Sequence, residues 1–278
     1  MSTLSGKTVL VIGGSSGIGF AVALGSLKAN AERVVIASSS QDRVANALER
    51  LKTRYTTETA SSAEGRVDSR VIDVTNHTAI KALFAELGEI DHLVLTYGGG
   101  FVQADFKELD LSSEKVRSPM DERYWSSLQA AQSAQIKPGG SITFTIGATL
   151  FHPVKKWTLN IGPVGALDAA TRSLAVELAP IRVNVVCPGV RQVDLHRSPH
   201  EVVTSYDILP IIQLFDRIPL PGGREKFMRG LDKNHLVGHV GTADEIAEAY
   251  LFLMKCGFIT GETIKVDGGS MLEASLQF

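Results

Sequence analysis

The glycine-rich stretch VLVIGGSSGIG, residues 9–19, most constrains how this chain can fold. An apolar run precedes it, and a segment with a helical pattern follows from Gly17 to Leu27. Glycine permits a tight turn there and lets phosphate oxygens approach backbone N–H groups at a helix N-terminus. Because the spacing comes with a strand before it and a helix after it, the stretch predicts a dinucleotide-phosphate site. The alternative is a glycine-rich turn that binds nothing. The predicted contacts are Gly13, Ser15, Ser16, Gly17, Ile18 and Gly19.

Short β-branched apolar runs alternate with longer helical patterns along the rest of the chain. The strands are expected at 7–13, 33–37, 69–74, 92–97, 141–147, 182–189 and 263–269, and the clearest helices at 17–27, 43–51 and 243–254. Continuously apolar strands that alternate with helices indicate a parallel sheet covered on both faces. We therefore predict an α/β fold with a doubly wound parallel sheet, a single Rossmann-fold domain over residues 1–278.

Two segments depart from this alternation. Residues 53–67 are polar and rich in Thr and Ser, which favours a surface excursion. Residues 191–227 are amphipathic and contain four prolines, and we place a helical substrate-loop insertion over 191–239. An insertion after the C-terminal end of a strand lies where open α/β sheets bind ligands, so it fits a lid. A packed helical hairpin fits equally well.

Composition excludes several classes of function. A net charge of -2 gives no general field for nucleic acid or an acidic membrane. No stretch reaches the roughly 20 apolar residues of a membrane helix, and two cysteines make no disulfide framework. We expect a cytoplasmic protein with a small-molecule substrate, no nucleic-acid partner and no membrane partner. The pairs His196/His200 and His235/His239 have i,i+4 spacing but lack the Glu of a zinc protease, so no metal is expected.

The end of the second predicted strand bears on which dinucleotide binds. NAD-binding folds usually place an acidic residue there for the ribose 2′-hydroxyl, whereas this chain has Ser38, Ser39 and Ser40, followed by Arg43. Hydroxyl groups and a guanidinium can donate hydrogen bonds to a 2′-phosphate, which favours NADP(H) over NAD(H). Alternatively, the serines only cap the next helix.

These motifs, together with DVT at 73–75, TRSLAVELAPIRVNVVCPG at 171–189 and ITGETIKVDGG at 259–269, resemble the short-chain dehydrogenase/reductase family over nearly the whole chain. The resemblance implies a homodimer or homotetramer that pairs through the helix containing residues 167–178. It also implies further cofactor contacts at Asp73, Val74, Gly98, Pro188 and Gly189.

The resemblance breaks at the catalytic positions. The family's Tyr, Lys, Ser and Asn fall on Asn160, Val164, Gly147 and, approximately, Arg123. The chain is similar in this respect to fungal biosynthetic members that lack the Tyr/Lys pair, for which imine reduction and pericyclic cyclisation are known. Val164 also fits a buried helical stripe, and Asn160 fits a loop residue that caps the helix.

A positioned general acid is worth roughly 10²–10⁴-fold in rate, so ordinary ketone reduction is disfavoured without the tyrosine. An iminium or conjugated acceptor is favoured instead. New polar groups stand near the altered positions, although each also has an ordinary structural explanation. The candidate catalytic residues are Arg123, His152, Trp157 and Asn160.

Three functions follow from this reading. The first is an atypical NADP(H)-dependent oxidoreductase of biosynthetic metabolism. The second is a redox-neutral isomerase or cyclase, which would use the cleft for shape and electrostatics. The third is a catalytically silent nucleotide-binding protein.

Overall fold

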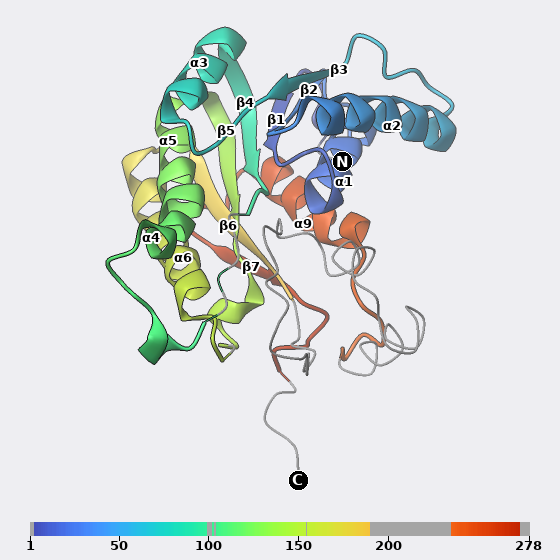
Figure 1. Cartoon of the computed structure of the whole chain (residues 1–278). Coiled ribbons are helices and arrows are strands. Elements are labelled where there is room, and N and C mark those ends of the chain that lie inside the picture. The colour runs from blue at the N-terminus through green and yellow to red at the C-terminus, as the bar shows by residue number, and fades with distance from the viewer. Residues whose placement is uncertain (1–2, 99–101, 103, 154, 190–234, 273–278) are drawn as a thin grey trace.

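A seven-stranded parallel sheet forms the centre of the molecule (Figure 1). The structure is a computed structural model that describes residues 3–98, 102, 104–153, 155–189 and 235–272. The strand order is β3-β2-β1-β4-β5-β6-β7, which confirms the predicted doubly wound α/β fold. The strands are β1 (Thr8–Ile12), β2 (Arg33–Ser38), β3 (Val67–Val71), β4 (Glu89–Leu95), β5 (Gln135–Thr145), β6 (Arg182–Pro188) and β7 (Thr263–Val266).

Helices cover both faces of the sheet, and each face has its own apolar core. On one face lie α1 (Gly17–Lys28), α2 (Gln41–Thr59) and α9 (Ala243–Lys255). On the other lie α3 (His77–Leu87), α5 (Ser126–Ser133) and α6 (Thr158–Glu177). The shorter elements are η1 (Phe106–Glu108), α4 (Glu114–Pro119), the π-helical turn η2 (Met120–Trp125) and η3 (Ala148–Leu150). Burial on both faces explains why the central strands consist of continuous apolar residues.

The surface excursion predicted for residues 53–67 is wrong over its first half, because α2 continues to Thr59. Tyr55 anchors this extension: its side chain is buried and its hydroxyl accepts a hydrogen bond of 2.8 Å from Arg66. Tertiary packing thus outweighs the weak helix propensity of the threonines. The helix ends at Ala60 in a left-handed conformation.

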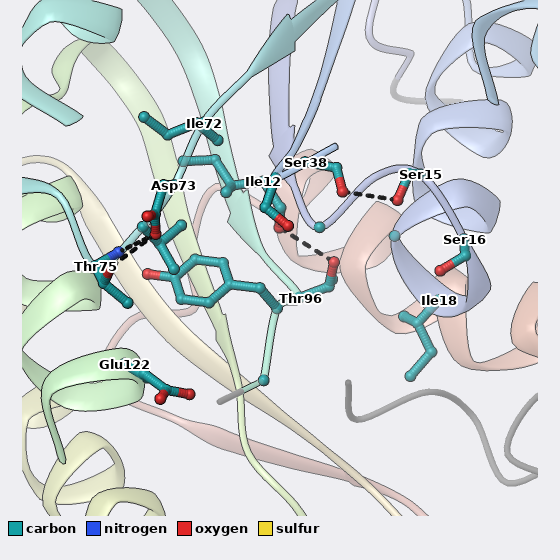
Figure 2. A pocket seen from close by; sticks show the side chains of 16 residues that line it. Ile12, Ser15, Ser16, Ile18, Ser38, Ile72, Asp73, Thr75, Thr96 and Glu122 are labelled. Atoms are coloured by element: carbon teal, nitrogen blue, oxygen red, sulfur yellow. Dashed lines mark hydrogen bonds between the residues drawn. The ribbon is translucent and has the colours of Figure 1, made fainter. Parts of the chain in front are cut away.

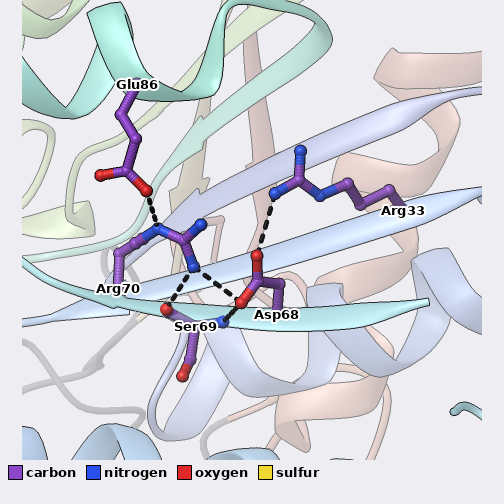
Figure 3. A network of polar contacts seen from close by, with 5 residues as sticks. All are labelled: Arg33, Asp68, Ser69, Arg70 and Glu86. Carbon is purple, nitrogen blue, oxygen red and sulfur yellow. Dashed lines mark hydrogen bonds and ion pairs between the residues drawn. The ribbon is translucent and has the colours of Figure 1, made fainter. Parts of the chain in front are cut away.

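The edge strand β3 lies two to three residues earlier than the predicted 69–74. Its polar residues explain the difference, since Asp68 accepts hydrogen bonds from Arg33 at 2.9 Å and from Arg70 at 2.7 Å, and Arg70 also contacts Glu86 (Figure 3). Charged side chains on an edge strand hinder pairing with another chain. A search for apolar runs therefore finds this strand but places it toward the apolar residues at its end.

The proposed lid at 191–227, with His196 and His200, lies outside the described residues. So does most of the wider insertion at 191–239. Within the described part of the chain, no helix is both long and apolar enough to cross a membrane.

Candidate functional site

The glycine-rich turn brings three backbone segments into contact at the start of α1. A Cβ atom on Gly13, whose φ is +93°, would lie 2.6 Å from Thr96 Oγ1 and 2.7 Å from the Tyr97 nitrogen. A Cβ atom on Gly19 would lie 2.3 Å from the Gly13 carbonyl oxygen. Glycine is therefore required at both positions, for the turn and for the close approach of α1 to the sheet. The first turn of α1 is left with backbone N–H groups of the kind that bind phosphate.

A pocket opens in front of this turn, at the carboxyl ends of β1, β2 and β4 (Figure 2). Ten of the predicted cofactor residues line it: Gly13, Ser15, Ser16, Ile18, Gly19, Ser38, Ser39, Asp73, Val74 and Gly98. Residues 12, 72, 75, 96, 97 and 122 complete the lining. This position, at the carboxyl ends of the strands where the strand order reverses, is where open α/β sheets bind ligands.

Serine hydroxyls and one arginine gather at the β2 end of the pocket. Ser15 Oγ donates to Ser38 Oγ at 3.0 Å, and the exposed Arg43 donates to Ser39 Oγ at 2.7 Å. Ser40 accepts a hydrogen bond from the Arg43 backbone nitrogen and caps α2. Helix capping is therefore carried by Ser40, whereas Ser38 and Ser39 line the pocket.

The remaining predicted cofactor residues lie in other surroundings. Gly17 borders a separate groove between α1, α2 and α9. Pro188 ends β6, and a Cβ atom on Gly189 would lie 2.3 Å from Asp267 Cβ, so close packing already requires glycine there.

Asp73 lines the pocket with a carboxylate that accepts two hydrogen bonds from Thr75, at 2.9 Å and 2.7 Å.

Arg123 is buried on the π-helical turn η2 and is 6% exposed. Its Nη2 donates to the Thr145 carbonyl oxygen at 3.2 Å, while its buried Nε has no hydrogen-bond partner among the described residues. None of the ion pairs within the described part of the chain involves it. Burial lowers the pKa of the guanidinium to about 10, so it stays charged at neutral pH. A buried, partly unsatisfied cation is a costly feature and is typical of functional sites.

Asn160 lies inside α6, so the prediction of a loop residue that caps this helix is wrong. The N-cap position is held by Trp157, which is half-buried. Both polar atoms of the Asn160 side chain bond the backbone of Val102: Oδ1 accepts from its nitrogen at 3.0 Å and Nδ2 donates to its oxygen at 2.6 Å. Val164 is 3% exposed, which confirms the interpretation as a core residue.

The other polar candidates near these positions also have structural contacts. The His152 Nε2 atom lies 3.1 Å from the Met271 carbonyl oxygen. Lys156 forms an exposed ion pair with Asp105 at 2.8 Å. The Tyr97 hydroxyl, a further possible proton donor, lies 3.0 Å from Ser126 Oγ on α5, and burial raises its pKa.

Three polar residues were not assigned to the cofactor pocket from the sequence, namely Thr96, Tyr97 and Glu122. Thr96 and Tyr97 directly follow β4, so the rule that ligands bind at the carboxyl ends of strands was the available signal. Glu122 comes from η2, which no periodicity in the sequence indicates (Figure 2). Groups of three or more His, Cys, Asp or Glu side chains suited to a metal are absent from the described residues.

Comparisons with known proteins agree with this geometry. A family model described as an SDR-like Rossmann domain matches residues 1–201. The short-chain dehydrogenase/reductase ATR9 of Stachybotrys chlorohalonatus is 32% identical, covering 98% of this chain and 100% of that protein. The short-chain dehydrogenase/reductase fsr5 of Gibberella fujikuroi is 31% identical, covering 98% and 97%. The solved structure of the MalC reductase/Diels-Alderase from Malbranchea aurantiaca superposes with a TM-score of 0.79 at 27% identity, covering 97% of this chain and 98% of that one.

Proposed function

Because the chain belongs to the short-chain dehydrogenase/reductase family, we propose that it is an NADP(H)-dependent oxidoreductase of biosynthetic metabolism that acts without a tyrosine acid. The observation that carries the proposal is a contrast within one site. Gly13 and Gly19 keep a tight turn at the start of α1, in front of which the pocket opens, and this turn is the phosphate cradle of the proposal. Asn160 and Val164, at the family's Tyr and Lys positions, are instead engaged in the fold.

The cradle fits a dinucleotide, which would supply a hydride when bound. In the proposed complex, the first turn of α1 binds the diphosphate, and Ser38, Ser39 and Arg43 receive the 2′-phosphate. Positive charge and hydroxyl donors at this end suit a phosphate better than a ribose hydroxyl. Asp73, Val74 and Gly98 would contact the adenosine half and the adjoining ribose, and Pro188 and Gly189 the nicotinamide side.

The acceptor in this proposal needs no proton from position 160. Iminium ions and conjugated carbonyl compounds meet this condition, because hydride addition neutralises the first and creates a delocalised anion in the second. Arg123 would stabilise negative charge that develops on a substrate oxygen through its fixed, buried positive charge. Trp157 would form a wall for a planar substrate, and His152 would transfer protons.

A second candidate is a redox-neutral cyclase on the same scaffold. It is favoured by the similarity to MalC, which is described as a reductase and a Diels-Alderase, and which is 28% identical over 97% of this chain. A catalytically silent nucleotide-binding protein is the third. Oxidation of NADPH in the presence of substrate separates the first candidate from the second, and turnover of any kind excludes the third.

The first experiment is calorimetric titration of the purified chain with NADPH and NADH. We expect micromolar binding of NADPH and at least tenfold weaker binding of NADH. Ser39→Asp should reverse this preference, because a carboxylate repels the 2′-phosphate and accepts from a 2′-hydroxyl. The exposed Ser62→Asp is the matched control and should leave both affinities unchanged. If the wild type binds neither nucleotide, the proposal that the chain is an NADP(H)-dependent oxidoreductase is refuted.

A further inference from the structure

Two segments that are distant in the sequence dock on each other beside the proposed site. Besides the two Asn160–Val102 hydrogen bonds, the Ala104 nitrogen donates to the Lys156 carbonyl oxygen at 3.2 Å, and Lys156 Nζ lies 2.8 Å from Asp105. We call these five residues the strap. The strap connects Val102, Ala104 and Asp105 to the start of α6. Gly98, a pocket-lining residue, lies four positions before Val102 in the sequence.

The Asn160 carboxamide acts as a substitute for a neighbouring strand. It pairs with both the donor and the acceptor of Val102, as one backbone residue pairs with another in a ladder. A carboxamide is not an acid in the working pH range, and this one already has partners for its oxygen and its nitrogen. The residue is therefore suited to hold the chain and unsuited to donate a proton.

Lys156 gives independent evidence that the docking is specific. Its φ is 70°, a left-handed conformation that non-glycine residues rarely adopt. Backbone strain of this kind persists only where surrounding contacts maintain it, and it is concentrated at functional sites. Here the Ala104 hydrogen bond holds the Lys156 carbonyl group, and Asp105 holds its side chain.

We propose that Asn160 is a positioning residue, which through the strap fixes the cleft wall beside the nicotinamide. The position at which the family resemblance expects a proton donor is thus used to hold the cleft in shape. The inference rests on the proposed function, since it assumes that the pocket lined by Gly98 binds the dinucleotide. It accounts for the loss of the tyrosine as a change of role at this position.

Asn160→Leu tests the proposal, because leucine keeps nearly the same shape and removes both hydrogen bonds. Hydrogen exchange of the full chain should show the Val102 amide exchanging about tenfold faster or more, as expected for loss of its acceptor. Thr158→Ala, an exposed change in the same helical turn, is the matched control and should exchange like the wild type. Lys156→Gly relieves the left-handed strain and removes the ion pair, and should leave the Val102 amide protected by Asn160.

Nucleotide binding supplies a readout that a purely structural contact would not change. NADPH carries the nicotinamide, whereas 2′,5′-ADP carries only the adenosine phosphates. Asn160→Leu should bind 2′,5′-ADP within twofold of the wild type. Its affinity for NADPH should fall at least fivefold, and the fluorescence enhancement of the bound reduced nicotinamide should be lost.

If the Val102 amide of Asn160→Leu exchanges its hydrogen at the wild-type rate, Asn160 does not protect it, and the strap is overturned. Faster exchange with unchanged NADPH affinity and fluorescence would overturn the positioning role. If the wild type binds both nucleotides, the proposed cofactor site stands whatever the variant does. If the wild type binds neither, the proposed function fails and the positioning role fails with it, even where exchange confirms the strap.

Discussion

His92 makes the folded state sensitive to acid in a way that can be calculated. Its side chain on β4 is 2% exposed, and its Nδ1 lies 2.9 Å from Ser141 Oγ on β5. Burial, together with the positive charge of Arg182, lowers the pKa of the imidazole to about 4, from 6.5 in an unfolded chain. The folded protein therefore keeps a neutral ring at pH values where the unfolded chain binds a proton.

The sign and size of the effect follow from this difference. Above pH 6.5 both states carry a neutral ring, so the stabilisation is fully present. As the pH falls from 6.5 to 4, only the unfolded state takes up the proton, and the free energy of unfolding decreases by about 1.4 kcal/mol per pH unit, or roughly 3 kcal/mol in all. Below pH 4 both states are protonated and this contribution changes no further.

Urea denaturation between pH 7.5 and pH 4 measures the loss. His92→Asn is the matched variant, because an asparagine amide can retain the hydrogen bond to Ser141 but does not titrate. The wild type should lose about 3 kcal/mol more than the variant over this range, while other titrating groups contribute equally to both. Identical pH dependence in the two proteins would show that protonation of His92 does not cause the loss of stability.

Four further predictions concern the site. Gly19→Ala should weaken NADPH binding at least tenfold in calorimetry, since its Cβ would lie 2.3 Å from a backbone oxygen. Val164→Lys should lower the unfolding free energy by about 2–4 kcal/mol in urea without creating ketone reduction, because the position is core. Gly147→Ser should cost under about 1 kcal/mol, because the added Cβ meets only one side-chain atom, at 3.7 Å. Arg123→Met should reduce turnover at least 100-fold in a substrate assay. It should leave the unfolding free energy equal or higher, since methionine buries no unsatisfied charge. A loss of stability with unchanged turnover would contradict this prediction.

The glycine-rich turn and the pocket in front of it were predictable from the sequence because backbone geometry determines them. Gly13 and Gly19 are required by contacts with the next strand and with each other, and only glycine satisfies them. Such a requirement leaves a local signal in the sequence. The same holds for Ser38 and Ser39, whose place at the end of β2 sets their position in the pocket.

The surroundings of the candidate catalytic residues were less predictable because tertiary contacts determine them. The partner of Asn160 is Val102, 58 positions earlier, and no spacing in the sequence relates the two. Likewise Tyr55 extends α2 through Arg66, against the propensity of its polar neighbours. The sequence named the candidate residues, but their contacts required the fold.

The charge on Arg123 bears on which acceptor the site would take. With a pKa of about 10 the guanidinium is positive at neutral pH, and its burial strengthens its field. Hydride addition to a conjugated carbonyl places negative charge on the oxygen, which a fixed guanidinium stabilises in the transition state. An iminium ion begins with positive charge and would be opposed by the same group before the hydride arrives. In the role proposed for it, Arg123 therefore favours a conjugated carbonyl compound over an iminium ion.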